Sequence, residues 1–226
     1  MSAINAADPV HAVLFDLDGT LVDSAPDLAG AANDLRDAHG LPPLPFNALR
    51  PMVGSGARGM LDAAFGIAPD DARFDALRSE FLGLYERRIL RETRVFERME
   101  PVLWALEQRG LPWGIVTNKV DRFSVPLVEG LGLMSRCAVL ISGDTTAHAK
   151  PHPAPLLEAA RRLGMDARHC VYVGDDRRDV EAGRSAHMRT LAAAWGYLGR
   201  GESAHAWCAQ AVLEQPDALL IWLGMA

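Results

Sequence analysis

Residues 11–20 read His11-Ala12-Val13-Leu14-Phe15-Asp16-Leu17-Asp18-Gly19-Thr20, and this stretch decides the fold class of the chain. Its first half is a continuous apolar run, which is typical of a strand buried in a parallel sheet. Two aspartates and a glycine then predict a tight turn at the carboxyl end of that strand. Because ligands of open α/β sheets bind beyond such strand ends, we expect chemistry at Asp16 and Asp18.

After Arg98 the chain alternates between short apolar runs and helical patterns. This alternation predicts an α/β fold with a doubly wound, Rossmann-like parallel sheet and helices on both of its faces. Besides 11–15, we expect strands at 113–117, 138–142, 170–174 and 190–194. We expect the intervening helices at 101–109, 121–131, 154–163 and 178–186.

A helical insertion interrupts this core soon after the first strand. A helical pattern begins at Ser24, and residues 46–94 show no strand-like alternation. We therefore predict a small helical cap domain at 24–95, inserted into a core formed by 1–23 and 96–226.

Composition narrows the function classes. The 226 residues carry a net charge of −6 and 49% hydrophobic residues, so the chain can bury a core and offers no concentrated basic face for nucleic acid. The three cysteines are widely spaced and suggest neither a disulfide framework nor a zinc site. No targeting segment or membrane span is visible, and we expect a cytoplasmic protein, a monomer or homodimer, that does not bind membranes.

Polar side chains follow three of the predicted strands, and one more lies in a later loop. They are Asp16 and Asp18, then Thr117 and Asn118, then Lys150 in a later loop, then Asp175, Asp176 and Asp179. If they converge, five carboxylates face one lysine, and two like charges about 4 Å apart repel by roughly 4 kcal/mol. Either some carboxylates are protonated or a divalent cation lies among them, and an all-oxygen donor set favours Mg²⁺.

Such a carboxylate pair suits phosphate esters. One carboxylate can attack phosphorus and form an aspartyl-phosphate, which divides a difficult displacement into two steps. The second carboxylate can protonate the leaving oxygen and later take a proton from water. A threonine hydroxyl, a lysine and a metal ion would hold the phosphoryl oxygens.

Four ordered segments resemble the signature motifs of the haloacid dehalogenase superfamily, and its phosphoglycolate phosphatase group in particular. These are Asp16-Leu17-Asp18-Gly19-Thr20, Val116-Thr117-Asn118, Lys150-Pro151 and Gly174-Asp175-Asp176-Arg177-Arg178-Asp179. The resemblance covers nearly the whole chain and includes a helical cap inserted after the first motif. It implies Mg²⁺-dependent hydrolysis of a small phosphorylated metabolite.

The resemblance also implies residue roles. Asp16 is the nucleophile and Asp18 the acid and base, while Thr117, Asn118 and Lys150 bind the substrate. Mg²⁺ is held by Asp16, Asp175 and the backbone carbonyl of Asp18. Asp176 and Asp179 lie behind these ligands and reach the metal through bound water.

The chain is also similar to the bacterial N-acetylmuramic acid 6-phosphate phosphatases in the cap segment Gly54-Ser55-Gly56-Ala57-Arg58-Gly59-Met60, together with Thr117-Asn118-Lys119 and Arg122-Phe123. This similarity moves the substrate from glycolate towards a sugar. Arg58 is either a fork that binds a substrate carboxylate or hydroxyl, or an exposed arginine at a helix start. The G-x-G-x-x-G spacing of this segment lacks the strand that a dinucleotide site needs.

Three alternatives remain open. A phosphomutase of the same architecture would pass the phosphoryl group to a sugar hydroxyl instead of water. A signalling receiver domain uses similar residues, but its phosphorylated aspartate does not lie on the first strand, and a metal-independent dehalogenase does not need Asp18.

Lys119 and Lys150 are the only lysines in the sequence, beside 21 arginines. This scarcity suggests that both occupy sites that need a compact ammonium, although the role of Lys119 stays open.

Overall fold

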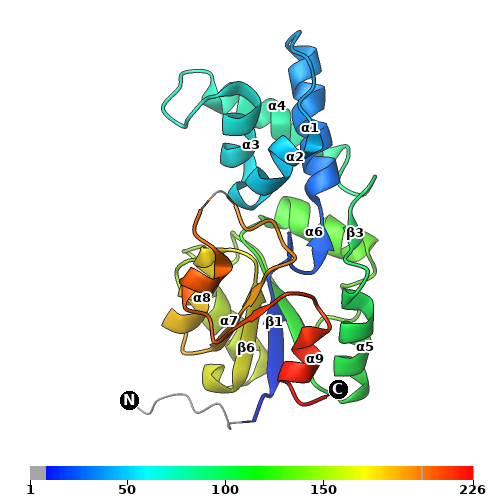
Figure 1. The fold of residues 1–226 in the computed structure, drawn as a ribbon, viewed down its shortest axis with the longest axis vertical. Helices are drawn as coiled ribbons and strands as arrows, with labels where there is room; N and C mark the ends of the chain where they lie inside the picture. Colours follow the sequence, from blue (N-terminus) through cyan, green and yellow to red (C-terminus); the bar gives the residue numbers. More distant parts are fainter. Residues whose placement is uncertain (1–8, 200, 226) are drawn as a thin grey trace.

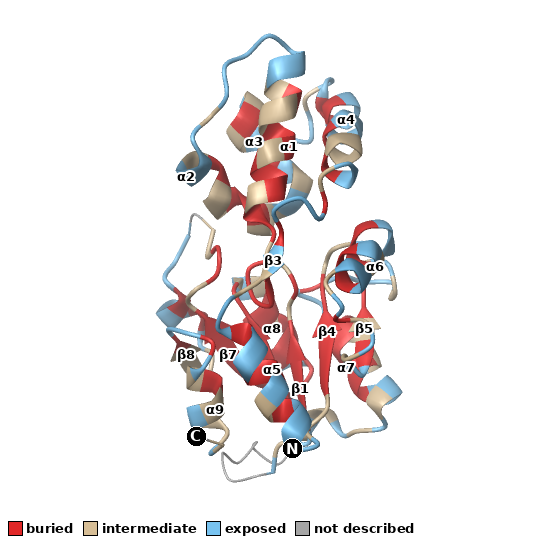
Figure 2. Ribbon diagram, turned by 90° about the vertical axis from the view of Figure 1, so that its right-hand side faces the viewer, coloured by how far each residue is buried: buried red, intermediate tan, exposed pale blue. Residues whose placement is uncertain are grey.

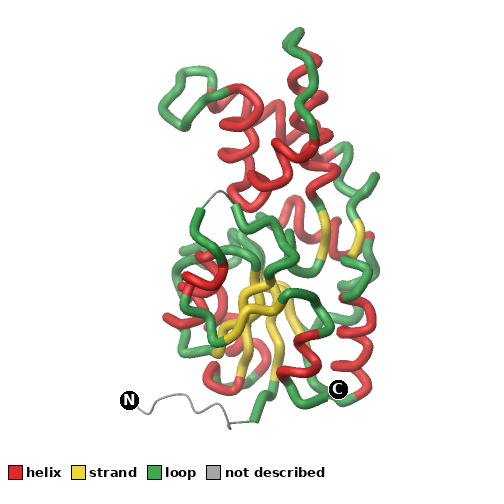
Figure 3. Tube along the Cα trace, viewed as in Figure 1, coloured by secondary structure: helices red, strands yellow, loops and turns green. Residues whose placement is uncertain are grey.

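The computed structural model describes residues 9–199 and 201–225. Its centre is a six-stranded, fully parallel sheet in the order β5-β4-β1-β6-β7-β8. The strands are β1 (Ala12–Phe15), β4 (Trp113–Val116), β5 (Val139–Ile141), β6 (Cys170–Gly174), β7 (Arg189–Ala193) and β8 (Ala211–Leu213). The sheet is enclosed by helices (Figure 3), which confirms the predicted doubly wound α/β core.

The burial of the strands agrees with the helices that cover the sheet. Every residue of β1, β4, β6 and β7 is buried, as expected for strands covered on both faces. The core helices are α5 (Met99–Gln108), α6 (Asp121–Gly130), α7 (Ala154–Leu163), α8 (Arg177–Ser185) and α9 (Ala218–Trp222), and two short 3₁₀ helices are Ala167–His169 and Ala204–Trp207. In Figure 2 the strands and the inner faces of these helices form a continuous buried layer.

A separate group of helices stands beyond the carboxyl ends of the strands (Figure 1). It consists of α1 (Ala25–Ala38), α2 (Phe46–Leu49), a 3₁₀ helix (Arg50–Ser55), α3 (Gly56–Phe65) and α4 (Phe74–Glu86). The chain leaves the core through β2 (Val22–Asp23) and returns through β3 (Arg94–Val95), which pair antiparallel. This small pair connects the insertion to the core.

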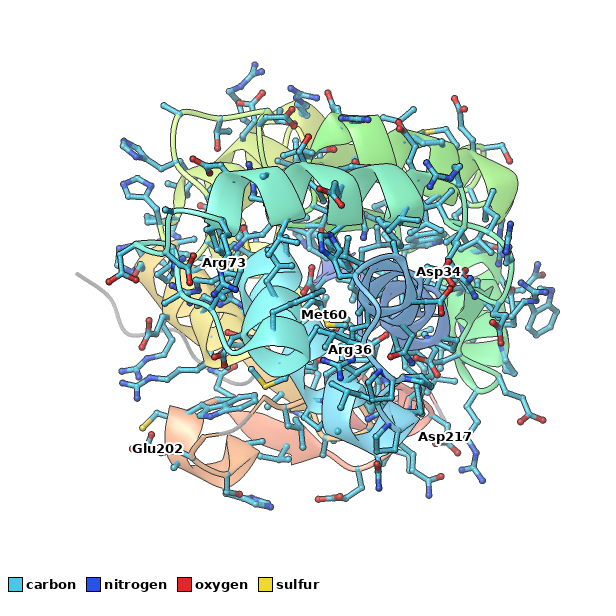
Figure 4. All side chains as sticks on the ribbon, turned by 90° about the horizontal axis from the view of Figure 1, so that it is seen from above. Asp34, Arg36, Met60, Arg73, Glu202 and Asp217 are labelled. Atoms are coloured by element: carbon cyan, nitrogen blue, oxygen red, sulfur yellow. The ribbon has the colours of Figure 1, made fainter. Side chains whose placement is uncertain are left out.

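The insertion, here called the cap, has a buried apolar interior that is continuous with that of the core. Met60 on α3 is fully buried, and a view from above shows it among the cap helices (Figure 4). Leu35, Phe81 and Tyr85 are also buried in the same continuous cluster. The cap is therefore a packed unit that can hold side chains over the sheet.

Several short elements were not expected from the sequence, among them β2, β3, β8 and α9. Both β8 and α9 follow residue 194, where the apolar pattern is short and interrupted by glycines. β8 has only three residues at the sheet edge, two of them half-buried, so it lacks the strong apolar run by which the central strands were found. Within the described ranges no helix combines the length and the apolar character needed to cross a membrane.

Candidate active site

A cavity of about 330 Å³ lies between the carboxyl ends of the strands and the cap. Eight of the nine predicted site residues line it, namely Asp16, Asp18, Thr117, Asn118, Lys150, Asp175, Asp176 and Asp179. They converge because β1, β4 and β6 are parallel neighbours in the sheet and end at the same edge. The ninth residue, Arg58, is exposed and lines a different, small hollow on the cap.

The turn after β1 places both aspartates of the first motif in this cavity. The Leu17 amide donates to Asp16 Oδ1 at 2.8 Å, which fixes that carboxylate at the strand end. Gly19 has a φ of +86°, a conformation that L side chains rarely adopt, and a Cβ there would overlap the carboxylate of Asp175. The glycine therefore allows the turn to approach a second acidic strand end.

Lys150 forms ion pairs with aspartates of the first and the last motif. Its ammonium lies 2.8 Å from Asp16 Oδ1 and 2.7 Å from Asp179 Oδ1, and its side chain is only 2% exposed. It also donates to Val116 O at 3.0 Å and to Tyr172 Oη at 2.7 Å. Burial alone would lower the pKa of Lys150, but the two carboxylates outweigh it and raise that pKa, so the side chain is a fixed cation.

The loop after β4 supports Lys150 from the backbone side. The Asn118 side chain donates to Lys150 O and accepts from Lys150 N, both at 2.9 Å. Thr117 is nearly buried, and its hydroxyl accepts from Lys119 N at 3.1 Å. Asn118 thus holds the lysine loop, and both polar ends of its amide are already used there.

Three carboxylates form a cluster suited to a cation. Oxygen atoms of Asp16, Asp175 and Asp179 lie within 4.8 Å of one another. Burial raises the pKa of Asp16 to about 7 against the effect of Lys150, and burial together with its acidic neighbours raises the pKa of Asp175 well above its usual value. A divalent cation would remove this repulsion, so the donor set fits a hard metal ion.

Asp175 is held in place on two sides. Thr20 Oγ1 donates to its Oδ1 at 3.0 Å, and the Tyr197 amide donates to its Oδ2 at 2.8 Å. A Cβ at Gly196 would overlap this carboxylate. Tyr197 was missed from the sequence because a lone aromatic 22 residues past the motif gives no signal.

The other two acidic residues of the last motif have different surroundings. Asp176 caps α8 by accepting from Arg178 N at 2.8 Å, and Asp179 Oδ2 accepts from Asp176 N at 3.0 Å. Arg178 pairs with Asp176 and also donates to Gly54 O at 2.5 Å. This arrangement ties the cap loop to the core, and the geometry brings Asp179, which was expected behind the metal ligands, into the acidic cluster.

Asp18 faces cap residues instead of that cluster. Its Oδ1 accepts from Ser24 Oγ at 2.5 Å and lies 3.2 Å from the Lys119 ammonium. Lys119 in turn donates to Tyr85 Oη on α4 at 2.9 Å. Although burial lowers the pKa of Lys119, Asp18 and Tyr85 raise it overall. The structure thus gives Lys119 a position between a catalytic candidate and the cap.

Tyr197 connects the start of the cap to the acidic cluster. Its hydroxyl accepts from Ser24 N at 2.8 Å and from Ala25 N at 3.0 Å, and it donates to Asp23 Oδ1 at 3.0 Å. These contacts satisfy backbone groups at the beginning of α1. One buried tyrosine therefore contacts both Asp175 and the segment through which the chain enters the cap.

Comparison with known proteins agrees with this geometry. Residues 13–193 match the family model described as haloacid dehalogenase-like hydrolase. A phosphoglycolate phosphatase of Xanthomonas campestris is 48% identical over 209 residues (92% of this chain, 94% of the relative), and an N-acetylmuramic acid 6-phosphate phosphatase of Pseudomonas aeruginosa is 41% identical over 211 residues (93% of each).

A solved structure has the same architecture. The crystal structure of a predicted phosphoglycolate phosphatase from Haemophilus somnus superimposes with a TM-score of 0.82 at 25% identity, covering 95% of this chain and 99% of the other. The predictions of family and of a hydrolytic enzyme are thereby confirmed. The chain belongs to the haloacid dehalogenase-like hydrolase family.

Proposed function

We propose that this protein hydrolyses a small phosphomonoester through an aspartyl-phosphate on Asp16. The observation that carries the proposal is the pairing of two carboxylates from one turn in one cavity, each beside its own lysine. Asp16 lies 2.8 Å from Lys150, and Asp18 lies 3.2 Å from Lys119. The relatives named as phosphatases support the same reaction class.

In the first step an Asp16 oxygen attacks phosphorus and the bond from phosphorus to the leaving oxygen breaks. Asp18 gives a proton to that oxygen, so the alcohol leaves neutral. In the second step Asp18 takes a proton from water, and the water oxygen attacks phosphorus. The bond to Asp16 breaks and inorganic phosphate is released.

The remaining groups balance the charge of the phosphoryl group and hold it in position. Lys150 balances Asp16 and offers its cation to an equatorial phosphoryl oxygen, and Thr117 lies beside it on the cavity wall. Mg²⁺ is the ion we propose for the acidic cluster, with Asp16, Asp175 and the Asp18 carbonyl as ligands and Asp179 adjacent. When bound, it would neutralise charge on the phosphoryl group in the transition state.

Two substrate candidates follow from the relatives' names. Phosphoglycolate is the first, and N-acetylmuramic acid 6-phosphate is the alternative. Both are phosphate esters that carry a carboxylate. Transfer to a second sugar hydroxyl, as in a phosphomutase, is the less favoured outcome. A cytoplasmic location and a monomeric or homodimeric state stay predictions.

Phosphate release from both esters, with Mg²⁺ and after chelation, tests the proposal. We expect Asp16→Asn to abolish turnover while circular dichroism and the melting temperature show an intact fold. Release of inorganic phosphate without any bisphosphate activator would exclude the phosphomutase. Full activity of Asp16→Asn would refute a mechanism through an aspartyl-phosphate on Asp16.

A further inference from the structure

Arg78 is a cation of the cavity that the proposed chemistry does not use. It lies on α4 and lines the cavity together with Phe81, Leu82 and Tyr85. These positions are three, four and seven residues further along the helix, so all four side chains lie on one helix face. Arg78 therefore belongs to the wall that the cap presents to a bound substrate.

The charges of the cavity wall make Arg78 exceptional. Four cationic residues line the cavity, and three of them have carboxylate partners: Lys119 with Asp18, Lys150 with Asp16 and Asp179, and Arg178 with Asp176. Among residues 9–199 and 201–225, Arg78 has no hydrogen bond or ion pair. An arginine whose planar fork is free in a substrate cavity is suited to a carboxylate, which it can bind through two parallel hydrogen bonds.

Helix geometry separates Arg78 along α4 from the end of the helix that lies near the first motif. Tyr85 marks the catalytic end of α4, because its hydroxyl lies 2.9 Å from the Lys119 ammonium that contacts Asp18. Arg78 lies seven residues away, about 10 Å along the helix axis. Long helical side chains lean towards the helix N-terminus, so Arg78 and Tyr85 lean the same way and keep this offset along the axis.

This separation selects among phosphorylated acids. In phosphoglycolate only three bonds of about 1.5 Å separate phosphorus from the carboxyl carbon, so this molecule covers little of a helix face about 10 Å long. A sugar ring with the phosphate at one end and an acidic arm at the other spans a much larger distance. The ring would then lie against the apolar wall formed by Val53, Ala57 and Leu82.

We propose that Arg78 binds the carboxylate of the substrate and that the substrate class is a phosphorylated sugar acid. The inference rests on the proposed phosphatase function and assigns specificity to a cap residue. Arg58, the residue expected for this role from the sequence, lines a hollow outside the cavity.

Two substrates that differ in one group test the proposal. N-acetylmuramic acid 6-phosphate carries an acidic ether arm that N-acetylglucosamine 6-phosphate lacks. For Arg78→Gln we expect KM for the acid to rise about tenfold or more, with kcat nearly unchanged, because a charge-assisted contact made equally in ground and transition states is lost. For Arg78→Gln, KM for N-acetylglucosamine 6-phosphate should stay within about twofold. Arg58→Gln, a matched change outside the cavity, should alter neither of the two KM values.

A binding measurement separates this proposal from the mechanism. In the Asp16→Asn background, calorimetry with the sugar acid phosphate should show the same loss of affinity on adding Arg78→Gln. Equal effects of Arg78→Gln on both sugars, no effect on either, or a higher kcat/KM for phosphoglycolate than for the sugar acid would overturn the assignment. If Asp16→Asn keeps its activity while Arg78→Gln still weakens binding of the acid, the covalent mechanism fails and the anion site stands.

Discussion

Replacing Lys150 by arginine keeps the positive charge and changes its shape, and we expect the variant to lose about 10²–10³-fold in kcat. The ammonium of Lys150 contacts four oxygens between 2.7 and 3.0 Å away, on Asp16, Asp179, Val116 and Tyr172. Those oxygens surround a point charge. A planar guanidinium cannot place its donors on all of them, so Asp16 would lose its present geometry.

The space around Lys150 limits the larger side chain as well. With the lysine side chain 2% exposed, extra atoms must displace neighbours, and overpacking of this kind costs about 1–3 kcal/mol of folding free energy. Most domains tolerate such a cost, since their total stability is about 5–15 kcal/mol. The expected result is thus a folded protein with little turnover.

Steady-state phosphate release and thermal unfolding should be measured on the same preparation. Arg161→Lys, a conservative exchange on a largely exposed side chain, is the control and should keep both properties. If Lys150→Arg kept a kcat near that of the parent, the buried geometry would not matter to the reaction, and the scarcity of lysine would be a feature of composition alone.

Three further predictions follow from contacts in the same cavity. Tyr85→Phe keeps the ring against Phe123 and removes the hydroxyl that holds Lys119. We expect kcat to fall by about tenfold with little change in melting temperature. An unchanged kcat would show that the contact between Tyr85 and Lys119 does not contribute to catalysis. Mg²⁺ at a hundredfold excess over its Kd should stabilise the chelated protein by about 2.7 kcal/mol, and Asp175→Asn should shrink that gain in differential scanning calorimetry. The pKa of Asp16 is raised to about 7, so between about pH 4 and 7 the metal-free folded protein holds a proton that the unfolded chain releases. The free energy of unfolding should therefore fall as the pH rises through that window. Asp16→Asn should lack this pH dependence of the free energy of unfolding.

The core and its central residues could be predicted because they depend on local pattern and on one rule of parallel sheets. Strand 170–174 and helix 154–163 agree with the structure to the residue, since the first is a continuous apolar run and the second has helical apolar periodicity. Residues at the ends of neighbouring parallel strands must share one edge, so Asp16, Thr117 and Asp175 had to converge.

Contacts between the cap and the core could not be predicted in this way. Tyr85 contacts Lys119, and Ser24 contacts Asp18, because the cap docks over the sheet. Tyr197 reaches Asp175 from the loop after β7, and nothing in the local sequence of these three residues encodes their placement. The same holds for the choice between Arg58 and Arg78. A glycine-rich loop drew attention to the first, whereas only the direction of α4 brings the second into the cavity.

The two lysines of this arginine-rich chain can now be explained by their surroundings. Both lie beside an aspartate of the first motif, and each ammonium also contacts a tyrosine hydroxyl, Tyr172 for Lys150 and Tyr85 for Lys119. An ammonium directs three donors from a single atom, so it can reach carboxylate and phenol oxygens on different elements at once. A guanidinium spreads its donors over a plane and needs a wider site, which the exposed arginines have and these positions lack. Lysine is therefore retained where a cation must fit between groups already fixed by the sheet and the cap.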